Sequence, residues 1–315
     1  MIINTGMRTD IPAFYSEWFQ NRLREGFVMV RSPYDPNSVT RYELDPNVVD
    51  IMVFCTKNPR PILSYIDEIK KFGLYFFVTI TPYGRDIEPN VPDYGDVFES
   101  FKILSREIGR EKCVVRYDPI FLSDIYDYDR HIAFASEMAK ALDGCTNRVV
   151  ISFIDLYEKT KRNFPEAKAV DFKDQMRLAE DLVRIFKPHG ITVQSCFEDS
   201  KLKTVGVDIS GCMTQRLLEE ANDIRLEAPK GAGARKGCDC LTGNDIGSYN
   251  SCLHLCRYCY ANYDEKEVRA NSALHDPKSP LLIGHLKETD VVHNAIQKSD
   301  IKKQVDIFDI LQGDS

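Results

Sequence analysis

Apolar runs of strand length alternate with amphipathic stretches of helical length over roughly the first 200 residues. The apolar runs are rich in β-branched and aromatic residues, as buried strands are. They lie at residues 1–4, 27–31, 49–55, 75–80, 113–117, 148–154 and 191–196. The amphipathic stretches lie at residues 12–25, 61–72, 96–108, 129–142 and 172–186. Strands that alternate with helices in this way pair in parallel, because each helix carries the chain back to the starting edge of the sheet.

The number of these units favours a barrel. Six or seven strand–helix units without a phosphate-binding glycine fingerprint favour a complete or partial (β/α) barrel of the TIM type over a doubly wound sheet. We therefore expect an α/β protein with a barrel over residues 1–203. A cysteine-rich segment over 204–262, including a helix at 214–222 with Thr214 as its N-cap, packs on the barrel mouth. Residues 263–315 form a polar, partly helical tail. Two stretches are expected to be loosely structured, a Gly-rich connector at 229–237 and a frayed helix at 298–315.

Polar residues follow the predicted strands at their carboxyl ends. They are Arg8, Thr9, Asp10, Thr56, Lys57, Asn58, Thr79, Tyr83, Arg116, Asp118, Asp155, Tyr157 and Glu198. In a parallel barrel these ends converge on one mouth, where active sites are built. We expect catalytic roles for Lys57, Arg116 and Asp118, and cofactor contacts from Arg8, Asp10 and Asn58. Two alternatives stay open, since polar residues also begin ordinary loops and Arg116 with Asp118 suits a structural ion pair.

Composition narrows the setting of this chemistry. The 315 residues are 43% hydrophobic and 28% charged, as in soluble globular proteins. The net charge of −7 argues against a nucleic-acid-binding surface over the whole protein, although it is compatible with a local basic channel. No apolar run is long enough to span a membrane, and Arg8 and Asp10 come too early for a secretory signal. We expect a cytoplasmic protein with no membrane partner.

Three cysteines near the C-terminal end form the most informative motif. Cys252, Cys256 and Cys259 are spaced Cys-x3-Cys-x2-Cys, and Tyr258 directly precedes the last of them. Three thiolates on one short loop can hold three irons of a [4Fe-4S] cluster and leave the fourth iron open. One alternative is a helix with all three cysteines on its core-facing side. Another is a zinc site, completed by His254 or Cys240 as the fourth ligand.

The remaining cysteines include a second candidate set. Seven of the ten cysteines lie between residues 196 and 259, and in a reducing compartment such clustering favours metal ligands over disulfides. Cys196, Cys212, Cys238 and Cys240 are candidates for a second, fully ligated cluster or a structural zinc ion. The alternative reading is that Cys196 and Cys212 are ordinary buried cysteines.

Several longer phrases resemble a known family. They are RTDIPAFYSEWF, VFCTKNPRP, RYDPI, ISFIDLYEKTKRN and DIGSYNSCLHLCRYCYAN. They are similar to an uncharacterised prokaryotic domain-of-unknown-function family, whose C-terminal cysteine cluster resembles the N-terminal cluster of radical S-adenosylmethionine (radical SAM) enzymes. The resemblance covers residues 8–262. It implies a barrel-like fold and iron–sulfur chemistry but names no substrate. A looser similarity to spore photoproduct lyase-type DNA repair enzymes is analogy alone.

The resemblance also implies roles for residues in the cysteine motif. Cys252, Cys256 and Cys259 would ligate the cluster, and Tyr258 would contact the adenine of S-adenosylmethionine. This chain departs from the usual pattern because the cluster loop comes last and no Gly-Gly-Glu run follows a strand. The ends of a barrel chain often lie close together, so a C-terminal loop can cap the mouth that an N-terminal loop caps elsewhere.

The leading interpretation is a radical SAM-type enzyme that acts on a small or unknown substrate in the barrel mouth. A reductant protein such as a ferredoxin or flavodoxin would supply its electron. The second interpretation is an iron–sulfur or zinc protein whose metal only staples the C-terminal segment or transfers electrons. The third is a metal-dependent hydrolase that uses Asp10, Asp118 and Glu198. The sequence leaves the involvement of nucleic acid open.

Overall fold

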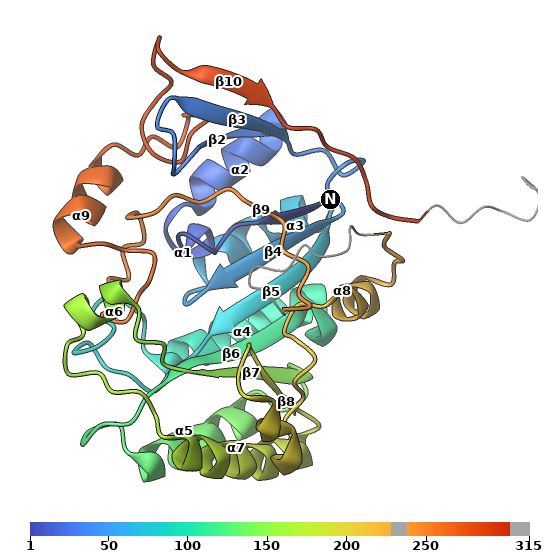
Figure 1. Cartoon of the computed structure of the whole chain (residues 1–315). Coiled ribbons are helices and arrows are strands. Elements are labelled where there is room, and N and C mark those ends of the chain that lie inside the picture. Colours follow the sequence, from blue (N-terminus) through green and yellow to red (C-terminus); the bar gives the residue numbers. More distant parts are fainter. Residues whose placement is uncertain (228–237, 303–315) are drawn as a thin grey trace, which may run out of the picture.

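The computed structural model of the chain describes residues 1–227 and 238–302. Its centre is a parallel sheet of seven strands, in the spatial order β8-β7-β6-β5-β4-β1-β9 (Figure 1). The strands are β1 (Ile2–Asn4), β4 (Ile51–Thr56), β5 (Gly73–Thr79), β6 (Cys113–Ile120), β7 (Arg148–Phe153), β8 (Thr192–Ser195) and β9 (Asn244–Asp245). Six of the seven predicted strands lie in this sheet, which confirms an α/β fold built on parallel pairing.

The sheet grows in one direction from β1. Strands β4 to β8 follow one another in chain order, and the late strand β9 pairs on the other side of β1, with Ile3 opposite Asn244. Within the described ranges, β8 and β9 are the two edges of the sheet and no strand pairing joins them. The parallel α/β sheet is therefore established, whereas a closed barrel is not.

The predicted strand at 27–31 belongs elsewhere. It forms β2 (Phe27–Arg31), which pairs antiparallel with β3 (Ser38–Glu43) in a second sheet of order β10-β3-β2, where β10 is Val291–Asn294. The expectation that this run joins the parallel sheet is wrong. Its burial explains why, because only Val28 in β2 is fully buried, whereas five of the six residues of β4 are. A strand covered on both faces is buried along nearly its whole length, and β2 is not.

Helices cover one face of the central sheet. They are α1 (Ile11–Phe14), α2 (Ser16–Glu25), α3 (Ile66–Ile69), α4 (Tyr94–Ile108), α5 (Tyr128–Ala141) and α7 (Phe172–Phe186). The predicted stretches at 96–108, 129–142 and 172–186 are confirmed, that at 12–25 divides into α1 and α2, and that at 61–72 is α-helical only over the four residues of α3. Short 3-10 turns accompany them at Pro61–Tyr65, Arg110–Lys112 and Lys187–His189. Alternate strand residues such as Phe54, Phe76 and Tyr117 join this helix-side core, because successive side chains of a strand point to opposite faces.

The other face of the sheet is covered by the chain that follows β8. Val53, Phe77 and Val150 pack there against residues that include Cys212 and Leu218. This segment contains a 3-10 turn at Ser200–Val205 and helix α8 (Gln215–Asn222), and the hydroxyl of Thr214 accepts the Leu217 N–H at 3.4 Å. The predicted helix and its N-cap are confirmed. Figure 1 shows α8 beside the sheet, away from α5 and α7.

The C-terminal part is more structured than a polar tail suggests. It contains α9 (Glu265–Ala273) and strand β10. A further short helix, α6 (Glu158–Asn163), belongs to the loop after β7. Trp18 in α2 donates its indole N–H to the carbonyl of Ser279 at 2.9 Å. The connector expected at 229–237 and residues 303–315 of the expected terminal helix lie outside the described residues. The helix prediction is wrong for residues 298–302, where Ile301 forms a β-bridge with Leu226. No helix in the described ranges is long and apolar enough to cross a membrane.

Candidate cysteine-loop site at the strand ends

The cysteine loop, residues 251–260, has no helical structure. Its residue Leu255 has a φ of +57° and Asn250, just before it, a φ of +53°. A right-handed helix cannot contain residues in this conformation. The alternative of one helix with three core-facing cysteines is therefore wrong. The backbone N–H of Cys259 bonds to the carbonyl of Cys256 at 3.1 Å, which closes a tight turn between these two cysteines.

The three thiols of the loop influence one another. Cys256 is buried and Cys252 and Cys259 are half-buried. Burial is the main reason that the pKa of each thiol is raised, and the nearby thiols raise the pKa values of Cys252 and Cys256 further. The ammonium of Lys57 acts in the opposite direction on Cys256 and Cys259. The Sγ atom of Cys259 also accepts the Ala261 N–H at 3.3 Å. The three side chains thus lie near one another, beside the ammonium groups of Lys57 and Lys159.

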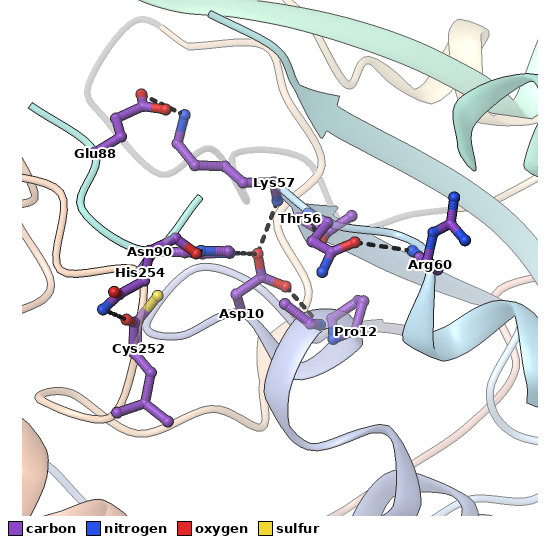
Figure 2. A network of polar contacts seen from close by, with 12 residues as sticks. Asp10, Pro12, Thr56, Lys57, Arg60, Glu88, Asn90, Cys252 and His254 are labelled. Atoms are coloured by element: carbon purple, nitrogen blue, oxygen red, sulfur yellow. Dashed lines mark hydrogen bonds and ion pairs between the residues drawn. The ribbon is translucent and has the colours of Figure 1, made fainter. Parts of the chain in front are cut away.

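His254 anchors the loop to the strand ends. Its ring is 2% exposed, with Nε2 at 2.9 Å from Oδ2 of Asp10 and Nδ1 at 3.2 Å from the carbonyl of Asn90. The same Asp10 oxygen accepts the backbone N–H of Lys57 at 2.7 Å, and Oδ1 accepts the N–H of Ala13 at 3.0 Å as the N-cap of α1. Figure 2 shows the Asp10 carboxylate between the His254 ring and Lys57. One carboxylate therefore joins α1, the end of β4 and the cysteine loop.

A second polar group surrounds Glu88. Its Oε1 atom accepts bonds from Nζ of Lys57 at 2.9 Å, from Oγ1 of Thr81 at 2.7 Å and from the hydroxyl of Tyr258. Lys57 is 12% exposed and Glu88 2% exposed, so the ion pair is nearly dry. Burial by itself would lower the pKa of Lys57, but Glu88 and the other negative groups around the ammonium together raise it. The Tyr258 ring lies 5.6 Å from Nζ of Lys57 and 6.2 Å from the ring of Tyr83.

The other predicted site residues form hydrogen bonds and ion pairs away from the cysteine loop. Arg116 and Asp118 form an ion pair at the end of β6, with Nε at 3.1 Å from Oδ2. Nε of Arg8 lies 2.7 Å from Oδ1 of Asp245, which ties the loop after β1 to β9. The side chain of Asn58 accepts the N–H of Arg60 at 3.2 Å and so turns back on its own loop. The structure therefore brings Lys57 and Asp10 to the cysteine loop, while Arg8 bonds across to β9 and Asn58 bonds within its own loop.

The candidates for a hydrolytic metal site each bond to a different partner. Asp10 is bonded to His254, Asp118 to Arg116, and Glu198 to the backbone of Phe153 at 2.9 Å. In the part of the chain that the structure describes, no three His, Cys, Asp or Glu side chains are arranged to hold one metal ion. The hydrolase interpretation receives no support.

The thiols of the second candidate set lie on the face of the sheet opposite α4, α5 and α7. Sγ of Cys212 is 3.7 Å from Sγ of Cys196 and 3.7 Å from Sγ of Cys240. Cys238 packs against the same apolar cluster. The seven clustered cysteines thus form two groups. Cys252, Cys256 and Cys259 lie in the cysteine loop, and the other four pack against the sheet.

Comparison with protein families extends these observations. The model of a family described as "Domain of unknown function (DUF1848)" matches residues 2–261. The chain belongs to this family. The DUF1848 match covers the whole parallel sheet and the cysteine loop, and it stops before α9. Membership of an uncharacterised family is thereby confirmed, while the relation to radical SAM enzymes stays a prediction. The comparison with curated proteins found no match.

Sequence reasoning missed Glu88, Thr81, Asn90 and Asp245. The first three lie in the long loop between β5 and α4, which the strand pattern marks only as a connection. Loops after strand ends carry many site residues in parallel α/β proteins, and this was the one available signal. Asp245 lies in a two-residue strand, too short for any hydrophobic periodicity to indicate.

Proposed function

We propose that this DUF1848 protein is an iron–sulfur enzyme of the radical SAM type. Cys252, Cys256 and Cys259 would hold three irons of a [4Fe-4S] cluster whose fourth iron stays open to S-adenosylmethionine. When bound, such a cluster supplies the electron for reductive cleavage of S-adenosylmethionine to a carbon radical. The electron would come from a ferredoxin or flavodoxin, and the substrate would lie at the strand ends.

The observation that carries this proposal concerns the fourth ligand. A structural cluster or zinc ion needs four protein ligands, and the sequence offers His254 and Cys240 for the fourth place. Both ring nitrogens of His254 face oxygen atoms of Asp10 and Asn90. Cys240 contacts the Sγ atom of Cys212 and the Met213 N–H instead. Within the described residues, both candidates for the fourth place have other partners, which supports a cluster with one open iron.

The surrounding residues suit a cluster loop held in a fixed place. Asp10 and Asn90 hold the loop through His254, and Asn262 donates an N–H to the carbonyl of Cys252 at 2.8 Å. Lys57 supplies positive charge next to Cys256 and Cys259, which stabilises their thiolate forms. Oδ1 of Asn262 is buried beside the loop without a hydrogen-bond partner, as a polar atom reserved for a ligand would be.

The order of the strands supports a partial barrel around this site. β1 and β4 to β8 succeed one another without the reversal that defines a doubly wound sheet. Their helices cover one face of the sheet, and Lys57, Arg116 and Asp118 lie at or just past the carboxyl ends of β4 and β6. In this proposal the cysteine loop caps the mouth of the partial barrel from the C-terminal side, and Arg116 and Asp118 position the substrate.

Anaerobic purification, with iron and sulfide analysis and electron paramagnetic resonance, tests the proposal. We expect a [4Fe-4S] signal in the reduced protein that changes when S-adenosylmethionine is added. Cys256→Ala should remove that signal, whereas Cys145→Ala, outside both thiol groups, should leave it unchanged. A signal that does not respond to S-adenosylmethionine would favour a cluster that only transfers electrons or staples the segment. Zinc in place of iron at the loop cysteines would end the radical proposal.

A further inference from the structure

Three cysteines outside the loop converge from three separate segments. Cys196 directly follows β8, Cys212 lies before α8 and Cys240 lies before β9. We refer to Cys196, Cys212 and Cys240 as the three-thiol group. Cys212 is 6% exposed and Cys240 5% exposed, and the two Sγ–Sγ distances of 3.7 Å meet at Cys212. The proposed enzyme function uses none of these residues.

The distances fit a shared metal ion. Four sulfurs at about 2.3 Å from a tetrahedral ion are separated from one another by about 3.8 Å. Two thiols in van der Waals contact have nearly the same separation, so the distance alone does not distinguish a metal site from simple packing. The polar surroundings of the thiols decide between these readings.

Two polar groups face these sulfurs. Sγ of Cys240 accepts the Met213 N–H at 3.3 Å, and Nη1 of Arg116 lies 4.0 Å from Sγ of Cys212. N–H donors and a guanidinium stabilise negative sulfur, whereas cysteines that only fill space need neither. Gly211 has a φ of +95°, and a Cβ there would stand 3.4 Å from Sγ of Cys240. The backbone before Cys212 therefore lies in van der Waals range of this sulfur atom.

The loop that carries Cys212 is also held in place. Gln194 in β8 is fully buried and donates Nε2–H to the carbonyl of Gly211 at 2.6 Å. Its Oε1 atom has no hydrogen-bond partner among the described residues. A buried amide that fixes the loop next to the central thiol is the type of outer support that metal ligands have in proteins.

We propose that the three-thiol group forms a second thiolate metal centre, independent of the cysteine loop, with Cys238 as its fourth thiol. Cys238 stands two residues before Cys240 and packs in the same apolar cluster. A thiolate set suits a zinc ion or a second iron–sulfur cluster, which share this ligand chemistry. Among the described residues, Cys196 and Cys240 each contact Cys212 but not each other, and no three donors are already arranged around one point. In this proposal, a bound metal draws the sulfur atoms of Cys196 and Cys240 toward each other.

The test removes the first centre in order to see the second. In the full-length Cys252→Ser/Cys256→Ser/Cys259→Ser variant, purified anaerobically, we expect about one zinc or about four irons with matching sulfide per chain. Zinc without sulfide identifies the ion, and iron with sulfide identifies the cluster. Adding Cys212→Ser should lower the metal content at least tenfold, whereas adding Cys145→Ser should not change it.

A second measurement covers the case in which the Cys212 variant does not fold. Cobalt(II) added to the metal-stripped loop variant should give the visible bands of a tetrahedral thiolate site. A folded loop variant that holds no metal and gives no cobalt bands would overturn the proposal, and so would a Cys196–Cys212 disulfide in the anaerobic protein. Failure of the radical SAM proposal would appear separately, as a wild-type protein whose loop cysteines bind no S-adenosylmethionine-responsive cluster.

Discussion

A few polar residues at the strand ends make most of the hydrogen bonds that attach the cysteine loop to the sheet. Asp10 accepts three N–H groups from α1, the end of β4 and His254. A carboxylate that accepts several hydrogen bonds in a buried place is a strong connector, because each bond to a charged acceptor contributes about 1.5 to 3 kcal/mol. The cysteine loop is thus attached to the sheet by polar bonds rather than by apolar packing alone.

The Lys57–Glu88 pair yields the first prediction. Glu88→Gln leaves the Lys57 ammonium nearly buried without its counter-charge, so the free energy of unfolding should fall by about 3 kcal/mol. Lys57→Met added to Glu88→Gln should recover part of that loss, which a double-mutant cycle in urea unfolding measures. The exposed pair Lys161–Glu158 is the control, and Glu158→Gln should give no measurable change. Equal effects at the two pairs would contradict the buried role of Glu88.

The sequence predicts one half of this pair and not the other. Lys57 follows a recognisable buried strand, so its place at the sheet edge can be predicted. Glu88 lies seven residues after Thr81 in an irregular loop, and no periodicity shows which loop acid turns inward. Spacing alone also cannot show that His254 bonds to Asp10, since 244 residues separate the two in the chain.

At the level of elements, β9 shows how closely the late segment approaches the early sheet. Gly243 precedes β9, and a Cβ at this position would stand 2.2 Å from the carbonyl oxygen of Ile2. We predict that Gly243→Ala separates β9 from β1 and lowers the free energy of unfolding by about 2 to 3 kcal/mol. Thermal and urea unfolding measure this effect.

Gly95 supplies the matched control for that substitution. It lies in α4 with open space around its Cα, so Gly95→Ala should leave stability unchanged or raise it by up to about 1 kcal/mol. A Gly243→Ala protein as stable as the Gly95→Ala protein would contradict the close packing of β9 on β1.

The small sheet offers a prediction of pH dependence. Arg31 at the end of β2 bonds to Asp290 next to β10, with Nη2 at 2.7 Å from Oδ2, and this bond lowers the pKa of Asp290 from 3.8 to about 2. A lowered folded-state pKa means that the pair stabilises the fold above pH 3.8 and loses this effect as pH falls toward about 2. In Asp290→Asn, stability should therefore fall less steeply over this range than in wild type. Parallel slopes for the two proteins, followed by circular dichroism, would exclude the pair as a source of acid sensitivity.

For the whole molecule, the local hydrophobic pattern of the sequence predicts the helices and strands better than it predicts how they are assembled. The nearly continuous apolar runs of β4 and β5 allow parallel strands to be predicted from the sequence. The placement of β2 in a second sheet, the open edges at β8 and β9, and the separation of the cysteines into two groups depend on contacts across hundreds of residues. Such contacts leave no short-range pattern in the sequence, because they are set by which surfaces remain uncovered after the sheet forms.

The family boundary is not the folding boundary, and this leads to the final prediction. The DUF1848 match ends at residue 261, yet residues 277–280 accept hydrogen bonds from Trp18, Asn21 and Met29 on α2 and β2. Trp18 is fully buried and is the only tryptophan of the chain. A chain ending at Asn262 loses these hydrogen bonds and exposes the indole to water. We expect its tryptophan emission to shift to the red and its Tm to fall.

A chain ending at Lys302 separates this effect from mere shortening. It keeps each of these contacts, so its emission and Tm should match those of the full chain. If the chain ending at Asn262 also matched the full chain, α2 would be covered by something other than residues 263–302. The expected result would instead make this C-terminal segment part of the folding unit, since it closes the surface of α2 that the family domain alone leaves open.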